Sequence, residues 1–211
     1  MQLTVSEARV LGSLVEKQLT TPEYYPLTLN ALTAACNQKS NRDPVMSLDE
    51  TSILSAVDSL RDKNLVYLFY GSTSRTVKYK HMLPSVLELE PPAVAVMTLL
   101  LLRGAQTIGE IRGRSDRLYE FSGLDEVQET LDDLTRREEP LVIKLERQSG
   151  QKEARYAHLL SGEVEKSPIT HQADRFLDAQ IEDDISVEIK RLANELAAFR
   201  AEFEEFKKQF D

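Results

Sequence analysis

Cysteine, histidine and glycine are scarce in this chain. Its 211 residues include one cysteine, three histidines and eight glycines, so no internal disulfide can form. Cys36 lies on an apolar stripe at helical spacing and is expected to be a small buried hydrophobe. No apolar run approaches the roughly 20 residues that span a bilayer, and no basic segment followed by an apolar one stands at the N-terminus. We therefore expect a cytoplasmic protein that does not enter a membrane.

The residues that could support enzyme chemistry are scattered. His81, His158 and His171 lie far apart, with no cysteine, histidine or carboxylate at metal-ligand spacing. Gly109 and Gly113 lack the spacing and the preceding strand of a phosphate-binding loop. The sequence predicts no enzymatic activity, no metal, no cofactor and no small-molecule substrate. An enzyme would require a cavity with converging titratable groups, which only folding could create.

Negative charge is distributed unevenly. The net charge is -9, but residues 1–85 carry +1, residues 86–165 carry -6 and residues 166–211 carry -4. Nucleic-acid affinity depends largely on neutralising phosphates, so only the first third can present a basic face without an opposing background field. The rest of the chain is expected to repel DNA on average.

Three helical patterns followed by a hairpin pattern occupy the first 85 residues. Thr4 and Glu7 form a capping box ahead of the first helix, and Thr28 caps the second. After a third apolar stripe the period changes from 3.6 to 2, and the segments 66–70 and 76–80 flank a Gly-Ser-Thr-Ser turn. Three helices and a hairpin in this order predict a winged helix.

The same order recurs after Pro91-Pro92, a pair that predicts a break in regular structure. Apolar positions of the third helices match at an offset of 74 residues, and those of the hairpins match at 76 and 77. The matched helix positions are Ile53, Val57 and Leu60 with Val127, Leu131 and Leu134. We therefore predict an α+β protein, mainly helical with small β-hairpins, made of two tandem winged-helix domains (1–85 and 86–165) and a linker with a C-terminal helix (166–211).

The C-terminal segment carries a heptad pattern, with apolar residues three and four positions apart. These are Ile185, Ile189, Leu192, Leu196, Phe199, Phe203, Phe206 and Phe210. A helix with this stripe needs a partner, so it either pairs between chains in a homodimer or folds back on the domains. Four phenylalanines crowd a two-stranded seam and disfavour a regular parallel dimer.

Long polar motifs of the first repeat identify a family. The stretches Ser13-Leu14-Val15-Glu16-Lys17-Gln18-Leu19-Thr20-Thr21-Pro22, Tyr25-Pro26-Leu27-Thr28-Leu29-Asn30-Ala31-Leu32 and Cys36-Asn37-Gln38-Lys39-Ser40-Asn41-Arg42-Asp43-Pro44 resemble the bacterial YceH family. So does the stretch from Gln106 to Arg114 in the second repeat. The resemblance implies a tandem winged-helix fold in a cytoplasmic protein, with a C-terminal helix that varies among relatives. It implies no activity and no functional residue.

Candidate nucleic-acid contacts lie in the first repeat, before the third helix and on the wing. In helix-turn-helix proteins the turn and the wing reach phosphates while the third helix enters the major groove. The candidate residues are Lys39, Ser40, Asn41, Arg42, Arg75, Lys78 and Lys80. The third helix itself offers few donors for guanine or phosphate. Its counterpart in the second repeat places several carboxylates outward, so there we expect a protein-facing role.

Each basic group also has a simpler interpretation. Lys39 and Arg42 could pair with Asp43 and Glu50 at an exposed turn, where such pairs are worth about 0–1 kcal/mol. The wing lysines could form a solvated edge that discourages strand pairing. Two functional hypotheses follow: a DNA-associated regulator that uses the first repeat, and a protein-interaction scaffold that does not bind DNA.

Overall fold

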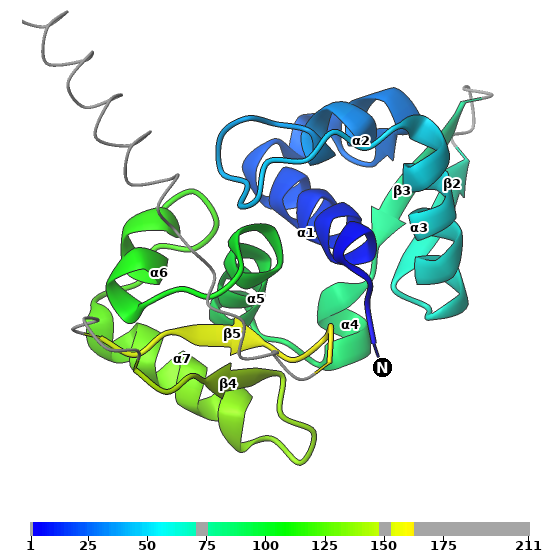
Figure 1. The fold of residues 1–211 in the computed structure, drawn as a ribbon. Helices are drawn as coiled ribbons and strands as arrows, with labels where there is room; N and C mark the ends of the chain where they lie inside the picture. Colours follow the sequence, from blue (N-terminus) through cyan, green and yellow to red (C-terminus); the bar gives the residue numbers. More distant parts are fainter. Residues whose placement is uncertain (1, 71–75, 148–152, 163–211) are drawn as a thin grey trace, which may run out of the picture. The chain divides into compact units, whose positions relative to one another are not determined.

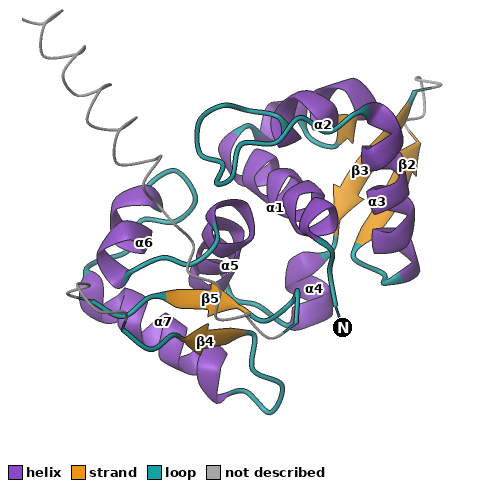
Figure 2. Cartoon of the chain, in the orientation of Figure 1, coloured by secondary structure: helices purple, strands orange, loops and turns teal. Residues whose placement is uncertain are grey.

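Helices and two small antiparallel sheets make up the protein, which confirms the predicted mainly helical α+β class (Figure 1, Figure 2). The structure is a computed structural model that describes residues 2–70, 76–147 and 153–162. Arg75, His171 and the predicted C-terminal seam lie outside the described residues. No helix within those three ranges is long and apolar enough to cross a membrane.

Capping side chains set the helix starts of the first repeat. The elements are α1 (Val5–Thr20), the 3-10 helix η1 (Pro22–Tyr24), β1 (Leu27–Thr28), α2 (Leu29–Cys36), α3 (Glu50–Asp62), β2 (Val66–Tyr70) and β3 (Val77–His81). The predicted capping box is present, because the Glu7 amide donates to Thr4 Oγ1 and the Thr4 amide donates to the Glu7 carboxylate. Thr28 Oγ1 accepts from the Ala31 amide at 3.3 Å and caps α2.

A three-stranded antiparallel sheet with strand order β1-β3-β2 closes the first repeat. The strand β1 has only two residues and was not expected from the sequence; it pairs Leu27 with Tyr79. The hairpin pairs Val66 with His81 and Leu68 with Tyr79. These positions face the core, and β2 lies at the sheet edge.

The second repeat follows the same order of elements, which agrees with the winged-helix prediction. Its elements are α5 (Pro91–Arg103), α6 (Ile108–Arg114), α7 (Leu124–Arg136), β4 (Val142–Lys144) and β5 (Tyr156–His158). Gln106 forms an isolated bridge with Tyr156, in the place where β1 pairs with Tyr79. Thr107 caps α6 with a second capping box, as predicted.

The break in regular structure predicted for residues 86–92 lies at residues 88–90, between two helices, and Pro91-Pro92 begin the second helix. Pro91 occupies the first position of α5, where no amide hydrogen is needed and the fixed φ of proline suits a helix. A short helix that the sequence did not predict, α4 (Leu83–Leu87), precedes it and ends at Glu88 in the left-handed conformation.

The two repeats pack through α1 and α5. Every residue from Val94 to Leu102 is buried, because α5 lies between α1 and α7. Gly12 of α1 permits the close approach, since a Cβ there would lie 3.0 Å from the Leu102 side chain. The Leu3 amide also donates to the Leu160 carbonyl at 2.6 Å. Residues 1–164 thus form one compact unit, and independent folding of domains divided at residue 85 stays a prediction.

Candidate nucleic-acid interface

The predicted contact residues fall in two separate places. The loop between α2 and α3 bends beside α5, where the Asp43 amide donates to the Leu102 carbonyl at 2.9 Å. This bend lies on one side of α1, and β2 and β3 lie on the other side (Figure 1). Lys39, Ser40 and Asn41 are therefore remote from Lys78 and Lys80.

Arg42 is not available to a phosphate, and its prediction as a contact is corrected here. The residue is 5% exposed. Its guanidinium donates to both carboxylate oxygens of Glu16, at 3.1 and 2.6 Å, and to the Ala35 carbonyl at 3.1 and 2.8 Å. It therefore pairs with α1 and with the end of α2, and it does not form the exposed ion pair with Glu50 that was the simpler alternative.

Further hydrogen bonds fix the same loop. Arg9 donates to the carbonyls of Cys36 and Pro44 at 3.1 and 2.6 Å, and the Asn37 side chain exchanges two bonds with the Leu48 backbone. Asn41 has a φ of 59°, and its side-chain oxygen accepts from Arg103 of α5 at 2.7 Å. The loop thus connects the repeats. Of the predicted contacts in this loop, Lys39, Ser40 and Asn41 are exposed, and Asn41 is bonded to Arg103.

Lys78 and Lys80 project from the outer face of the first sheet. Side chains alternate along a strand, so these lysines point opposite to Tyr79 and His81, which are buried against the core. They lie directly across from Phe69 and Tyr67 of β2. We call this surface the wing face, and it consists of Thr28, Tyr67, Phe69, Lys78 and Lys80.

Two aromatic rings, which the sequence analysis did not select, are exposed on the wing face. Tyr67 and Phe69 are 49% and 45% exposed. The described strands β1, β2 and β3 contain no aspartate or glutamate. The run Val-Tyr-Leu-Phe-Tyr is apolar or aromatic at every position, so its sequence does not reveal which side faces solvent. The wing face therefore combines two cations with two aromatic surfaces.

The corresponding face of the second sheet has a different character. Ile143 and Ala157 form the pair that corresponds to Tyr67 and Lys80. Arg155 corresponds to Lys78, but its guanidinium donates to the Ala105 carbonyl and to Glu110 of α6. The second wing thus lacks aromatic rings at these positions, and the cation at the position of Lys78 is neutralised by Glu110.

The third helices also differ at matched positions. Thr51, Ser52, Ser55 and Ser59 of α3 correspond to Asp125, Glu126, Glu129 and Asp133 of α7. Hydroxyl groups on α3 are neutral toward a phosphate backbone, whereas the carboxylates on α7 repel it. The exposed face of α7 is consequently unsuited to nucleic acid.

Buried titratable groups support the fold. Burial, with the charge of Lys80 as a smaller cause, lowers the pKa of His81 to about 4, and burial alone lowers that of His158 to about 4. Burial raises the pKa of Cys36 to about 11, so its thiol stays protonated at neutral pH. Both histidines and the cysteine are therefore neutral near pH 7, as packed core residues are.

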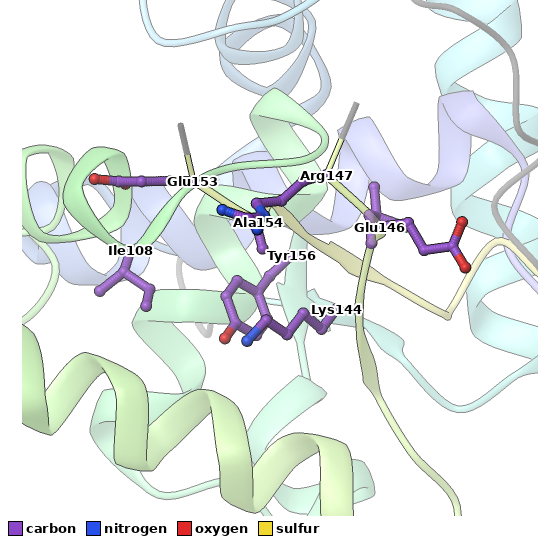
Figure 3. A pocket seen from close by; sticks show the side chains of 8 residues that line it. Ile108, Lys144, Glu146, Arg147, Glu153, Ala154 and Tyr156 are labelled. Carbon is purple, nitrogen blue, oxygen red and sulfur yellow. The ribbon is translucent and has the colours of Figure 1, made fainter. Parts of the chain in front are cut away.

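Two hollows on the described surface are lined by residues of the second repeat and of the segment 86–88 before it. One hollow, of about 660 Å³, lies beside β4 and β5, where the Lys144 ammonium sits 5.8 Å from the Tyr156 ring centroid. Figure 3 shows the carboxylates of Glu146 and Glu153 pointing to opposite sides of it. Among the described residues, no group of histidine, cysteine, aspartate or glutamate is arranged to hold a metal ion.

Comparison with known proteins identifies the family. Residues 3–151 match the family described as "Protein of unknown function, DUF480". The UPF0502 protein of Pelobacter propionicus is 47% identical over all of this chain and 99% of its own length. Those of Geotalea uraniireducens and Geobacter metallireducens are 47% and 56% identical, over 97% and 77% of this chain and 99% and 74% of their own lengths. The chain therefore belongs to the DUF480 family and is similar to UPF0502 proteins along its whole length, in agreement with the family resemblance of its motifs.

Proposed function

We propose that this protein is a non-enzymatic, cytoplasmic protein that associates with nucleic acid through the wing face of its first repeat. The observation that carries the proposal is the pair Lys78 and Lys80 on one face of β3, with no carboxylate in the described strands of that sheet. Two residues apart on a strand, the lysines emerge about 6.6 Å from each other. Each can neutralise one backbone phosphate, which is the main source of non-specific affinity.

The second repeat supports this division of roles. Its matched wing positions are Ala157 and the neutralised Arg155, and its third helix is acidic. A duplex or strand that approached α7 would meet carboxylates, whereas the wing face presents only cations and neutral groups. Nucleic acid is thus expected to engage one end of the molecule.

Fluorescence anisotropy tests the proposal. Labelled 20-nucleotide DNA and RNA strands and a 20-base-pair duplex are titrated with protein across a range of salt concentrations. The variant K78Q/K80Q should bind more weakly, and its slope of log affinity against log salt should decrease by about 1.4 to 1.8. The control R112Q/R136Q removes the same charge from exposed ion pairs of the second repeat and should bind like the wild type. Absence of binding to every probe at 20 mM salt would reject the proposal.

A protein-interaction scaffold is the second candidate function. It is favoured by the exposed acidic face of α7, beside which Leu124 is 55% exposed. Co-purification from the native cell with and without nuclease separates the two candidates. A partner set that nuclease removes supports nucleic-acid association, and a set that nuclease leaves intact supports the scaffold.

We also propose that the heptad segment 185–210 pairs between chains in a homodimer. The support is the sequence pattern, which lies outside the described residues. Light scattering on the full chain and on a chain ending at Lys166 tests it. A mass per particle of two chains that falls to one chain on truncation supports the dimer, and an unchanged number of chains rejects it.

A further inference from the structure

The aromatic rings of Tyr67 and Phe69 lie partly in water on the wing face, which is unfavourable for apolar surface. Lysines alone would suffice for phosphate contact, and roughly half of each ring is in water. Both rings belong to β2, which lies at one edge of the sheet, and they project from its outer face. Exposed apolar surface of this kind marks a binding site when it is contiguous.

The register places each ring beside one ammonium group. Phe69 lies opposite Lys78 and Tyr67 lies opposite Lys80. Side chains directly opposite each other on an antiparallel pair have their Cβ atoms about 4.5–5.5 Å apart. The wing face thus repeats one unit twice, an aromatic ring with a cation next to it.

The spacing of these units fits an extended strand. The two rings lie about 6.6 Å apart along β2, nearly twice the roughly 3.4 Å per nucleotide of a helical strand. Bases of a duplex are stacked on one another and paired, so their faces cannot meet a protein ring. Unpaired bases can separate and stack individually on aromatic side chains while cations track the backbone.

Charge and shape favour a polyanion over a protein partner. The described strands of this sheet carry lysines and no carboxylate. Aromatic anchors of protein interfaces usually fill pockets, but neither described hollow is lined by a wing-face residue. The matched positions of the second repeat, Ile143 and Ala157, provide neither a ring nor a cation.

We infer that the wing face binds single-stranded nucleic acid, with two successive bases stacked on Tyr67 and Phe69 and backbone phosphates held by Lys78 and Lys80. This inference rests on the proposed function and narrows its ligand to the single strand. It needs no base-specific contact, so DNA and RNA strands are both accepted.

Anisotropy with labelled dT20, rU20 and a 20-base-pair duplex tests the inference. We expect at least about 10-fold tighter binding of a single strand than of the duplex. The variant Y67A/F69A should lose at least about 10-fold in affinity for the single strand, since each stacked base contributes that order, and should retain its duplex affinity within about 2-fold. The control I143A, at the matched position of the second repeat, should change neither. Equal affinity for strand and duplex, or an equal loss for both in Y67A/F69A, would overturn the inference.

A second measurement remains informative if the alanine variant folds poorly. The chain contains no tryptophan, so Tyr67→Trp introduces a single indole at the wing face and keeps an aromatic ring there. Its fluorescence should be quenched by dT20 and unaffected by the duplex; unchanged fluorescence at saturating dT20 would reject stacking at this position. If K78Q/K80Q weakens every probe while Tyr67→Trp senses no strand, the proposed function stands and the single-strand inference fails.

Discussion

The hairpins of the two repeats pair in the same register. Val66 pairs with His81 in the first, and Val142 pairs with His158 in the second. The carbonyl of Leu65 accepts from the amide of Met82, just as that of Leu141 accepts from Leu159. Residues that face the core therefore keep their kind and their place across the offset of 76 and 77 positions.

Residues that face solvent, by contrast, differ between the two repeats at matched positions. Tyr67 and Lys80 in the first repeat are replaced by Ile143 and Ala157 in the second, and hydroxyls on α3 are replaced by carboxylates on α7. The buried positions set the fold, whereas the exposed positions set which partners each copy can accept. The connecting loops of the two repeats should therefore respond to mutation in different degrees, whereas the buried histidines and the helix caps should respond alike.

The connecting loop of the first repeat should be the more sensitive one to mutation. Arg42→Met removes the two bonds to the Glu16 carboxylate, which is 12% exposed and keeps only the Lys17 ammonium at 3.6 Å, and it removes the bonds to Ala35. We expect a loss of about 3 kcal/mol in the free energy of unfolding, measured by urea denaturation. Tyr119→Phe in the corresponding loop of the second repeat removes a single bond to Glu126 and should cost about 1 kcal/mol. Equal losses of unfolding free energy in the two variants would contradict the view that only the loop of the first repeat is held by a buried ion pair.

Acid should destabilise the protein through its two matched histidines. The imidazole of His81 takes up a proton near pH 6.5 when unfolded but only near pH 4 when folded. The free energy of unfolding therefore decreases as the pH falls from 6.5 to 4, by up to about 3 kcal/mol for this group. Burial lowers the pKa of His158 to about 4 as well, so this group should contribute a similar loss over the same pH range.

Urea denaturation at pH 7 and pH 4.5 measures this difference. The variant His81→Asn keeps a hydrogen-bond acceptor for the Leu83 amide and should show a loss on acidification that is about 2 kcal/mol smaller than that of the wild type. His158→Asn should show a similar reduction, because the pKa of His158 is lowered to the same value. The same pH dependence in the wild type and in His81→Asn would exclude a buried neutral imidazole.

The matched caps of the second helices should contribute alike. Thr28 and Thr107 accept bonds from the third amides of α2 and α6, at 3.3 and 3.1 Å. Thr28→Ala and Thr107→Ala should each lower the free energy of unfolding by about 1 kcal/mol. If the two variants differ by more than about 1 kcal/mol in the free energy of unfolding, the threonine caps do not contribute equally in the two repeats.

Local signals made the framework predictable. The capping box at Thr4 and the caps at Thr28 and Thr107 mark the starts of three helices. The constant offset between the repeats aligns the two hairpins from the sequence alone. The strand β1 escaped prediction because it has two residues and pairs with a strand about fifty positions away. The break within residues 86–92 was predictable because a proline is excluded from the interior of a helix but suits its first turn, where Pro91 lies.

The candidate site was only partly predictable. Lys78 and Lys80 follow from the alternation of the wing, but the burial of Arg42, in the loop between α2 and α3, depends on Glu16 of α1, which is 26 residues distant. The rings of Tyr67 and Phe69 were hidden in a strand whose every side chain is apolar or aromatic, so that periodicity gave no contrast between its faces.

Transplanting the second wing face onto the first tests the central claim most directly. The variant Y67I/F69L/K80A carries the residues found at 143, 145 and 157, and its affinity for dT20 is measured by anisotropy, with urea denaturation as the check of folding. We expect unfolding within about 1 kcal/mol of the wild type, because the changed side chains face solvent, and at least a 10-fold loss of affinity. A folded variant that binds dT20 as tightly as the wild type would contradict the claim that the first wing face is the nucleic-acid interface.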